Sequence, residues 1–188
     1  FHESCWKCRR KKHTGRIRQG RDFVYNREGE QMEKEEYKKI SEVIYIIDRS
    51  RSMYGKEKEI TESFNRWLAQ QKQMKKEALV TLALCNEECE LLYCRMPLKY
   101  VKPLDTFAYY TKGYSAYLDS AEEVLDLLSK LMPQEEKSRQ DVSLYLITDG
   151  LDNVSSEAER ERFKEKIQRL KESGWKVALW DHRRQNYN

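Results

Sequence analysis

The sequence predicts an α/β sandwich with a mostly parallel sheet and helices on both faces. Short apolar runs alternate along the chain with longer segments of helical periodicity, the pattern of strands and crossover helices. One pair of predicted strands is joined by too few residues for a crossover helix, so these two strands pair antiparallel. They place an antiparallel strand at one edge of the sheet.

The first half of this domain begins with a central strand over Val43 to Ile47, a run of β-branched and aromatic residues bounded by polar ones. A helix is expected from about Lys56 to Met74, where apolar residues follow a period of 3.6. Strands follow over Ala78 to Leu84 and over Glu90 to Arg95. The residues between them, 85–89, make the short connection that forces antiparallel pairing.

The second half predicts a helix from about Ser115 to Leu131 and a strand over Val142 to Ile147. A helix over Glu157 to Ser173 and a strand over Trp175 to Trp180 complete the pattern. Gly174 stands between them, where a helix C-cap is expected.

Charge divides the chain into a basic arm, residues 1–41, and a domain, residues 42–188. Residues 1–21 contain eight Lys or Arg against one acid, a net charge of +7, whereas the whole chain carries +4, which leaves −3 for the rest. We expect the arm to be partly disordered, with a short helix from about Glu30 to Ile40. A chain of 188 residues is long enough for one domain with a sizeable core.

Oxygen-bearing side chains come immediately after two of the predicted strands. Asp48, Ser50 and Ser52 come directly after the first strand, and Asp149 follows the strand over Val142 to Ile147. Loops at the carboxyl ends of parallel strands meet in one crevice, and hard oxygen donors suit a small divalent cation. The alternative is structural: the aspartate caps a turn, and the serines cap the next helix.

These motifs, Asp-x-Ser-x-Ser after one strand and Thr-Asp-Gly after another, resemble the von Willebrand factor type A (VWA) domain with its metal-ion-dependent adhesion site. The resemblance runs from about Glu42 to Trp180. The sequence resembles bacterial intracellular members of the family in particular, in the segments Ile-Asp-Arg-Ser, Ala-Leu-Val-Thr, and Leu-Leu-Tyr followed by Arg and Pro. The family takes another ligand from a Gly-x-Thr-Ala-Leu-type segment, and Ser115 holds that position here.

The resemblance implies a Rossmann-like three-layer sandwich and a site for Mg²⁺ or Mn²⁺. Its ligands would be Asp48, Ser50, Ser52, Ser115 and Asp149. It also implies a further helix, and usually a strand, after residue 180, where only eight polar residues remain. The implied function is protein–protein interaction, in which the ion captures an Asp or Glu side chain of a partner. An enzyme is not expected, because no nucleophile–base arrangement is legible.

Two arginines depart from the family pattern. Arg51 stands where the family commonly has glycine, and Arg49 flanks it. Guanidinium groups beside a dication raise its electrostatic cost unless they point into solvent or pair with an acid. Alternatively, they contact an acidic partner.

The basic arm offers a second candidate site, formed by His2, Cys5, Cys8 and His13. Thiolates and imidazoles at such spacings suit tetrahedral Zn²⁺. The alternative is a solvated basic tail with two thiols.

The arm also supplies the competing hypothesis on function. Its basic residues could contact nucleic-acid phosphates, foremost Lys7, Arg9, Arg10, Lys11 and Lys12. The protein would then be a structural or nucleic-acid-associated scaffold component with an idle metal site. Salt-sensitive binding that depends on residues 1–21 distinguishes this hypothesis from the first.

The five cysteines show no spacing of a disulfide framework, which favours a reducing, cytoplasmic setting. Cys85, Cys89 and Cys94 lie on or beside the predicted hairpin and are expected to be small buried thiols. No apolar run approaches the about 18 residues that span a bilayer, so no membrane association is expected.

Overall fold

The computed structural model describes residues 24–25, 31–32, 40–132, 141–149 and 155–181. The chain divides into two units, Phe1–Lys38 and Lys39–Asn188. In the smaller unit, strands β1 (Val24–Tyr25) and β2 (Gln31–Met32) form an antiparallel pair.

The helix expected near residues 30–40 is wrong where the structure describes it. Gln31 and Met32 form a strand, and Ile40 lies outside any helix. The mixed charges of this segment fit an exposed helix, but Val24 and Tyr25 are residue types that favour strands, and Val24–Tyr25 pairs with Gln31–Met32. Residues 33–39 lie outside the described part of the chain.

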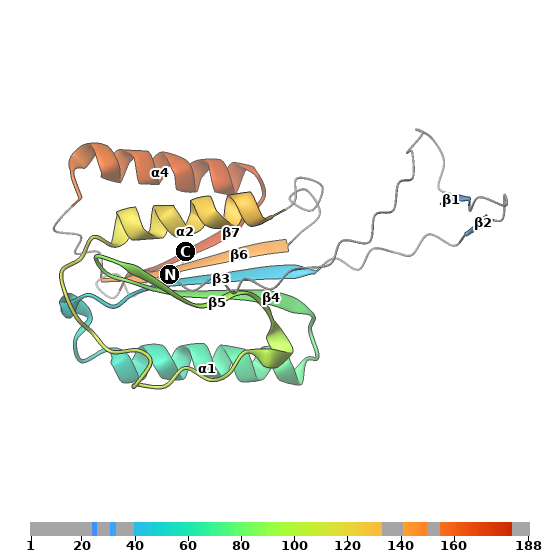
Figure 1. Cartoon of the computed structure of the whole chain (residues 1–188), viewed down its shortest axis with the longest axis horizontal. Helices are drawn as coiled ribbons and strands as arrows, with labels where there is room; N and C mark the ends of the chain where they lie inside the picture. Colours follow the sequence, from blue (N-terminus) through green and yellow to red (C-terminus); the bar gives the residue numbers. More distant parts are fainter. Residues whose placement is uncertain (1–23, 26–30, 33–39, 133–140, 150–154, 182–188) are drawn as a thin grey trace, which may run out of the picture. The chain divides into compact units, whose positions relative to one another are not determined.

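The larger unit contains a five-stranded sheet, which confirms the predicted fold class, a Rossmann-like α/β sandwich (Figure 1). Its strands lie in the order β5-β4-β3-β6-β7. Their bounds are Ser41–Asp48 for β3, Ala78–Cys85 for β4, Cys89–Pro97 for β5, Asp141–Thr148 for β6 and Lys176–Asp181 for β7. All neighbours are parallel except β4 and β5, so the antiparallel strand lies at an edge as predicted.

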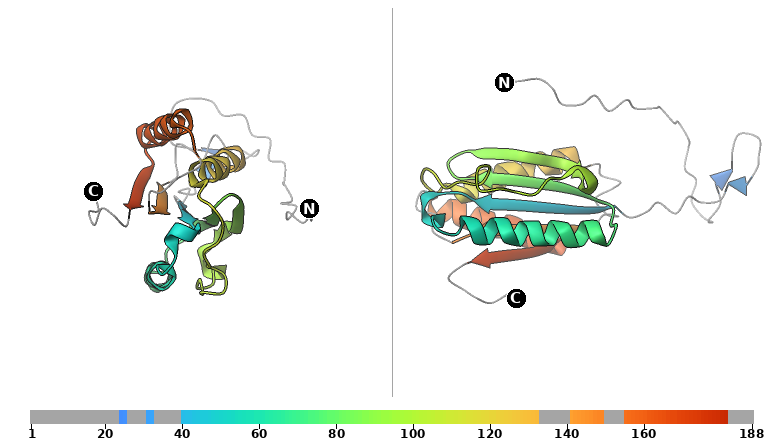
Figure 2. Two further views of the ribbon diagram at one scale, coloured as in Figure 1. Left: turned by 90° about the vertical axis from the view of Figure 1, so that its left-hand side faces the viewer. Right: turned by 90° about the horizontal axis from the view of Figure 1, so that it is seen from below.

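Helices cover both faces of the sheet, as Figures 1 and 2 show. Helix α1 (Glu57–Gln73) lies on one face, and helices α2 (Tyr117–Leu131) and α4 (Glu157–Glu172) lie on the other. Two short 3-10 helices, η1 (Arg51–Met53) and η2 (Leu98–Tyr100), follow β3 and β5. The segment after η2 returns along α1, where Asn65 bonds both backbone groups of Leu104 at 2.7 Å.

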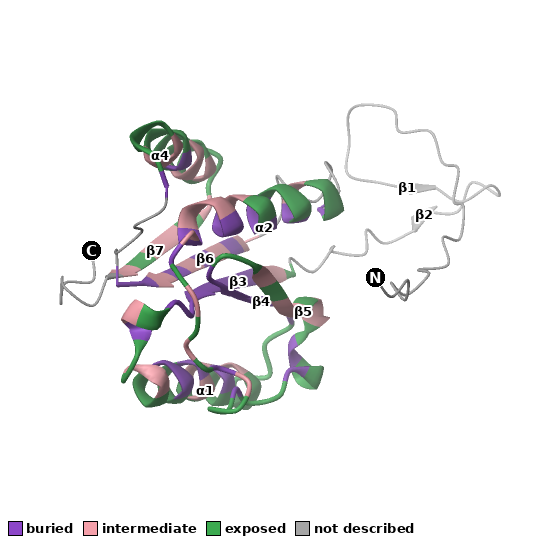
Figure 3. Cartoon of the chain, turned by 60° about the vertical axis from the view of Figure 1, so that its left-hand side comes forward, coloured by how far each residue is buried: buried purple, intermediate pink, exposed green. Residues whose placement is uncertain are grey.

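The core explains why β3 is central. Every residue from Glu42 to Asp48 is buried (Figure 3), and alternate side chains join opposite core clusters. Tyr45 faces α1, where its ring stacks on Tyr145 at 4.6 Å and meets Phe64 edge-on at 5.2 Å. Ile44 and Ile46 face the α2 layer. Among the described helices, none combines the length and the apolar character that crossing a membrane would require.

Candidate metal centre

Asp48 and Asp149 meet at the carboxyl edge of the sheet. Strands β3 and β6 are parallel neighbours in the register Ile47 to Ile147, so both strands end at the same level. Thr148 Oγ1 donates a hydrogen bond of 2.9 Å to Asp48 Oδ2, across 100 residues of sequence. The side chains of Asp48 and Asp149 are both buried. The structure therefore brings together the two motifs that the sequence analysis paired.

The loop before α2 joins this edge through the backbone. Lys112 N donates to Arg49 O at 2.8 Å, and Arg51 N donates to Gly113 O at 3.2 Å. These two bonds place residues 112–115 against the loop after β3. The third predicted segment, with Ser115, thus lies beside the first.

The three serines have different surroundings. Ser50 N donates to Asp48 Oδ1 at 2.8 Å, and the hydroxyls of Ser50 and Ser52 lie 3.0 Å apart. Ser115 Oγ is buried and has no hydrogen-bond partner among the described residues. A buried hydroxyl without a partner costs free energy, so Ser115 suits a site that is completed by a ligand.

The helix-capping alternative receives little support. Ser50 stands at the N-cap of η1, and its side chain makes no cap hydrogen bond. Helix α1 begins later, with Lys56 at its N-cap. The turn-forming alternative holds in part for Asp48, because its carboxylate accepts the Ser50 N–H.

Burial raises the pKa of Asp48, and the nearby charge of Asp149 raises it further, whereas hydrogen bonds from Ser50 and Thr148 lower it. Two buried carboxylates at one edge repel each other, which a cation between them would relieve. Below this edge, Tyr109 donates its hydroxyl to Asp48 O at 2.7 Å. Burial raises the pKa of Tyr109 far above its ordinary value, so it remains a protonated donor.

Lys56 is a residue of the site that the sequence analysis missed. Its Nζ lies 3.3 Å from Asp149 Oδ2 and 3.2 Å from Ser52 O. A signal was present in the sequence, because a lysine at the start of a helix neither caps it nor suits the positive end of its dipole. A lysine in this unfavourable position indicates that it pairs with an acidic side chain elsewhere in the fold.

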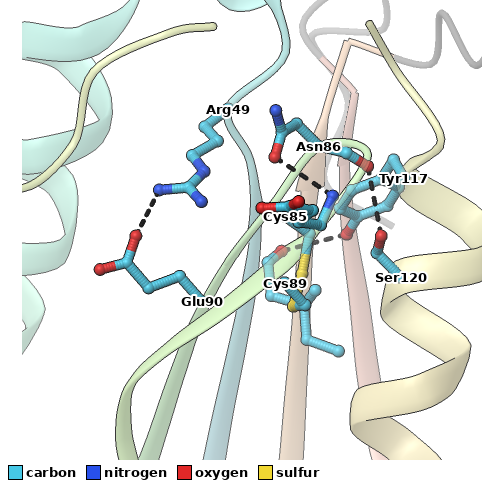
Figure 4. Close-up of a disulfide and its surroundings, with 9 residues drawn as sticks. Arg49, Cys85, Asn86, Cys89, Glu90, Tyr117 and Ser120 are labelled. Atoms are coloured by element: carbon cyan, nitrogen blue, oxygen red, sulfur yellow. Dashed lines mark hydrogen bonds and ion pairs between the residues drawn. A yellow bond between two sulfur atoms is a disulfide. The ribbon is translucent and has the colours of Figure 1, made fainter. Parts of the chain in front are cut away.

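The two arginines take separate roles. Arg49 is buried, and its NH1 lies 2.6 Å from Glu90 Oε2 on β5 (Figure 4). Arg51 is exposed. One guanidinium thus pairs with an acid and the other reaches solvent, the two conditions under which they tolerate a nearby cation. Of the two, only Arg51 is exposed.

The hairpin cysteines correct a prediction. Cys85 and Cys89 form a disulfide across the β4–β5 connection (Figure 4). Cys94 is exposed. The expectation of small buried thiols is therefore wrong for Cys94, which is exposed, and for Cys85 and Cys89, which are disulfide-bonded, although Cys85 is buried as expected. The reason is register, because Cys85 and Cys89 are directly opposite in the antiparallel ladder.

The buried residue Asn86 contacts and stabilises the loop that carries Ser115. Asn86 Nδ2 donates to Lys112 O at 3.2 Å, and Ser120 Oγ donates to Asn86 O at 3.2 Å. Glu87 Oε1 accepts from Tyr114 N at 2.7 Å. The position of this loop thus depends on the hairpin as well as on the β3 loop.

We expect Gly113→Ala to destabilise this junction. Gly113 has φ of +70°, and an added Cβ would lie 2.6 Å from Asn86 Nδ2. Backbone strain costs about 1–2 kcal/mol, and displacement of Asn86 from Lys112 O adds about 1 kcal/mol. The measurement is urea unfolding beside Gly174→Ala, where φ is +94° and nothing lies within 4 Å. Equal losses in the two variants would contradict the close contact with Asn86.

The donor set fits a hard divalent cation, with two carboxylates, three serine hydroxyls and water. Across the described ranges, no group of three or more His, Cys, Asp and Glu side chains could hold a metal ion. Among the described residues, the candidate site thus offers two carboxylates and three serine hydroxyls. The predicted zinc residues, His2, Cys5, Cys8 and His13, lie outside the described residues.

Comparison with known proteins gives distant structural likenesses. No family model matches the chain, and no curated protein matches it. BatB from Bacteroides thetaiotaomicron is 14% identical at a TM-score of 0.47, with 79% of this chain and 75% of that chain covered. An aerotolerance-related membrane protein from Bacteroides fragilis is 14% identical at 0.44, with 75% and 67% covered.

A third structure is the ArnB paralog VWA2 from Sulfolobus acidocaldarius, 20% identical at a TM-score of 0.45. The match covers 75% of this chain and 34% of that one, so this chain spans about a third of that protein. Likenesses at this level carry no inference about ligand or activity.

Proposed function

We propose that the larger unit is a metal-dependent protein-interaction module. The residues that would hold Mg²⁺ or Mn²⁺, directly or through water, are Asp48, Ser50, Ser52, Ser115 and Asp149. When bound, the ion supplies a Lewis-acidic coordination position for an Asp or Glu side chain of a partner protein. Arg51, exposed beside this edge, would contact the same acidic partner.

The observation that carries the proposal is the burial of two carboxylates at one sheet edge. Asp48 and Asp149 are 0% and 3% exposed, and burial, together with the nearby charge of Asp149, raises the pKa of Asp48. Two buried carboxylates at one edge repel each other, and a bound cation would offset the free energy that this repulsion costs. The unpartnered Ser115 hydroxyl, on the adjoining loop, supports the same conclusion.

Binding is proposed in preference to catalysis. The sequence shows no Ser–His–Asp or Cys–His arrangement, and among the described residues no general base is identifiable beside Asp48.

Thermal unfolding of the metal-stripped full chain tests the proposal. Mg²⁺ or Mn²⁺ at 100 times its dissociation constant should stabilise the native state by about 2.7 kcal/mol. We expect Asp48→Ala to lose this stabilisation and Glu123→Ala, an exposed acid on α2, to keep it. No stabilisation in the unaltered protein, or an undiminished one in Asp48→Ala, would refute the proposal.

The basic arm remains the second candidate, favoured by its net charge of +7 over residues 1–21. The measurement is RNA or DNA binding as a function of salt concentration, with Gln in place of Lys7, Arg9, Arg10, Lys11 and Lys12. Salt-sensitive binding that these substitutions abolish would assign nucleic acid to the arm. A Zn²⁺ stabilisation that survives Asp48→Ala would instead point to the cysteines and histidines of the arm.

A further inference from the structure

The ammonium group of Lys56 already occupies part of the proposed cation site. It lies 3.3 Å from Asp149 Oδ2 and 3.2 Å from Ser52 O, and so contacts both segments that would ligate an ion. The Lys56 side chain is 17% exposed and that of Asp149 is 4% exposed. We infer that Lys56 is an internal cation that competes with the divalent ion for this site. The inference rests on the proposed function.

The position of Lys56 in the fold supports a specific role for its charge. Lys56 is the N-cap residue of α1, and its side chain makes no cap hydrogen bond. A cation is disfavoured at the N-terminus of a helix, because the dipole is positive there. Asp, Asn, Ser or Thr would suit the position better. What Lys56 gains at this point is its contact with Asp149.

A charge count shows why the two cations compete. Among the described residues, the two candidate carboxylate ligands, Asp48 and Asp149, carry −2 when both are ionised, and Lys56 brings the sum for these three side chains to −1. A divalent ion would bring this to +1 with the ammonium in place, but to 0 without it. Arg49 does not alter the count, because Glu90 neutralises it at 2.6 Å. An excess positive charge in a buried cluster is unfavourable, so either Lys56 withdraws or the ion binds weakly.

Lys56 is able to withdraw. Its stem is flexible, its ammonium is strongly hydrated, and its side chain already reaches solvent in part. Two consequences follow. The fold does not depend on the ion, because Lys56 already neutralises part of the charge on the carboxylates. The ion is also held more weakly than the same oxygen atoms would hold it alone.

The test is Mn²⁺ titration calorimetry on the full chain. We expect Lys56→Met to lower the Mn²⁺ dissociation constant about tenfold, because a nearby positive charge is removed. Lys56→Gln should act in the same direction, and Lys56→Arg should keep the weaker affinity. The matched control is Lys58→Met, two residues along α1, where the side chain is 85% exposed and lies 3.9 Å from Glu62.

Thermal unfolding separates competition from a purely structural role. Without metal, Lys56→Met should melt at a lower temperature than the unaltered protein, since Asp149 loses its ammonium contact. With saturating Mg²⁺, the deficit should disappear. An equal deficit with and without Mg²⁺, or an unchanged Mn²⁺ affinity, would overturn the inference while leaving the metal site intact. Absence of Mn²⁺ binding in both the unaltered protein and Lys56→Met would overturn the proposed function and the inference together.

Discussion

Replacing Arg95 by methionine is expected to lower the free energy of unfolding by about 3 kcal/mol. Arg95 Nε lies 3.3 Å and 3.2 Å from the two carboxylate oxygens of Glu42, which is fully buried at the start of β3. Arg95 NH1 also donates to Leu131 O, at the end of α2, at 3.1 Å. The substitution removes the guanidinium group and leaves the buried carboxylate of Glu42 without it. Urea unfolding at neutral pH measures the loss.

The double variant Glu42→Gln/Arg95→Met is the control. It removes both charges of this pair, so we expect it to recover most of the stability that Arg95→Met loses. A single variant within about 1 kcal/mol of the unaltered protein would show that the pair lies in solvent-like surroundings. Equal losses in the single and double variants would show that packing, and not charge, is what Arg95 contributes.

Asp48→Asn is expected to abolish stabilisation by Mg²⁺ and yet to stabilise the metal-free protein at neutral pH. Burial raises the pKa of Asp48 above its ordinary value of 3.8. A group whose pKa is higher in the folded state contributes stability below its unfolded pKa, and this contribution is lost as pH rises through the folded pKa. At neutral pH the ionised carboxylate therefore opposes folding, and the neutral amide does not. The amide oxygen still accepts from Ser50 N.

The measurement is the free energy of unfolding of metal-stripped protein between mildly acidic and neutral pH. We expect the advantage of Asp48→Asn over the unaltered protein to grow as pH rises through the folded pKa. Glu123→Gln, which removes an exposed charge from α2, should show no such trend. A metal-free Asp48→Asn that is less stable at neutral pH would contradict a destabilising buried charge at this position.

The sheet could be predicted from local sequence, because its signals are local. The apolar run Val43 to Ile47 is long enough to specify a buried central strand. The brief connection after Cys85 permits only a hairpin. Parallel pairing of β3 and β6 then brings Asp48 and Thr148 together, although 100 residues separate them. Each of these predictions depends on a few neighbouring residues and on a general rule of chain geometry.

Other features depend on contacts that no local pattern carries. In the sequence, Glu42 is an ordinary charged residue at the start of a strand. Its burial becomes evident only in the folded structure, where Arg95 of β5 bonds its carboxylate. The partner of Lys56 lies 93 residues away on the loop after β6. The helix expected near residue 30 was wrong because its charges resemble those of a helix surface, while the strand pairing depends on Val24 and Tyr25.

Water-proton relaxation by Mn²⁺ tests whether the candidate site holds an ion with an open coordination position, as we claim. An ion held by a slowly tumbling protein relaxes water protons faster than free Mn²⁺, provided that a water molecule exchanges on it. We predict such an enhancement for the full chain, its loss in Asp48→Ala, and its reduction by acetate, which displaces the water as a partner carboxylate would. An enhancement that is absent, or that persists undiminished in Asp48→Ala, would contradict the claim.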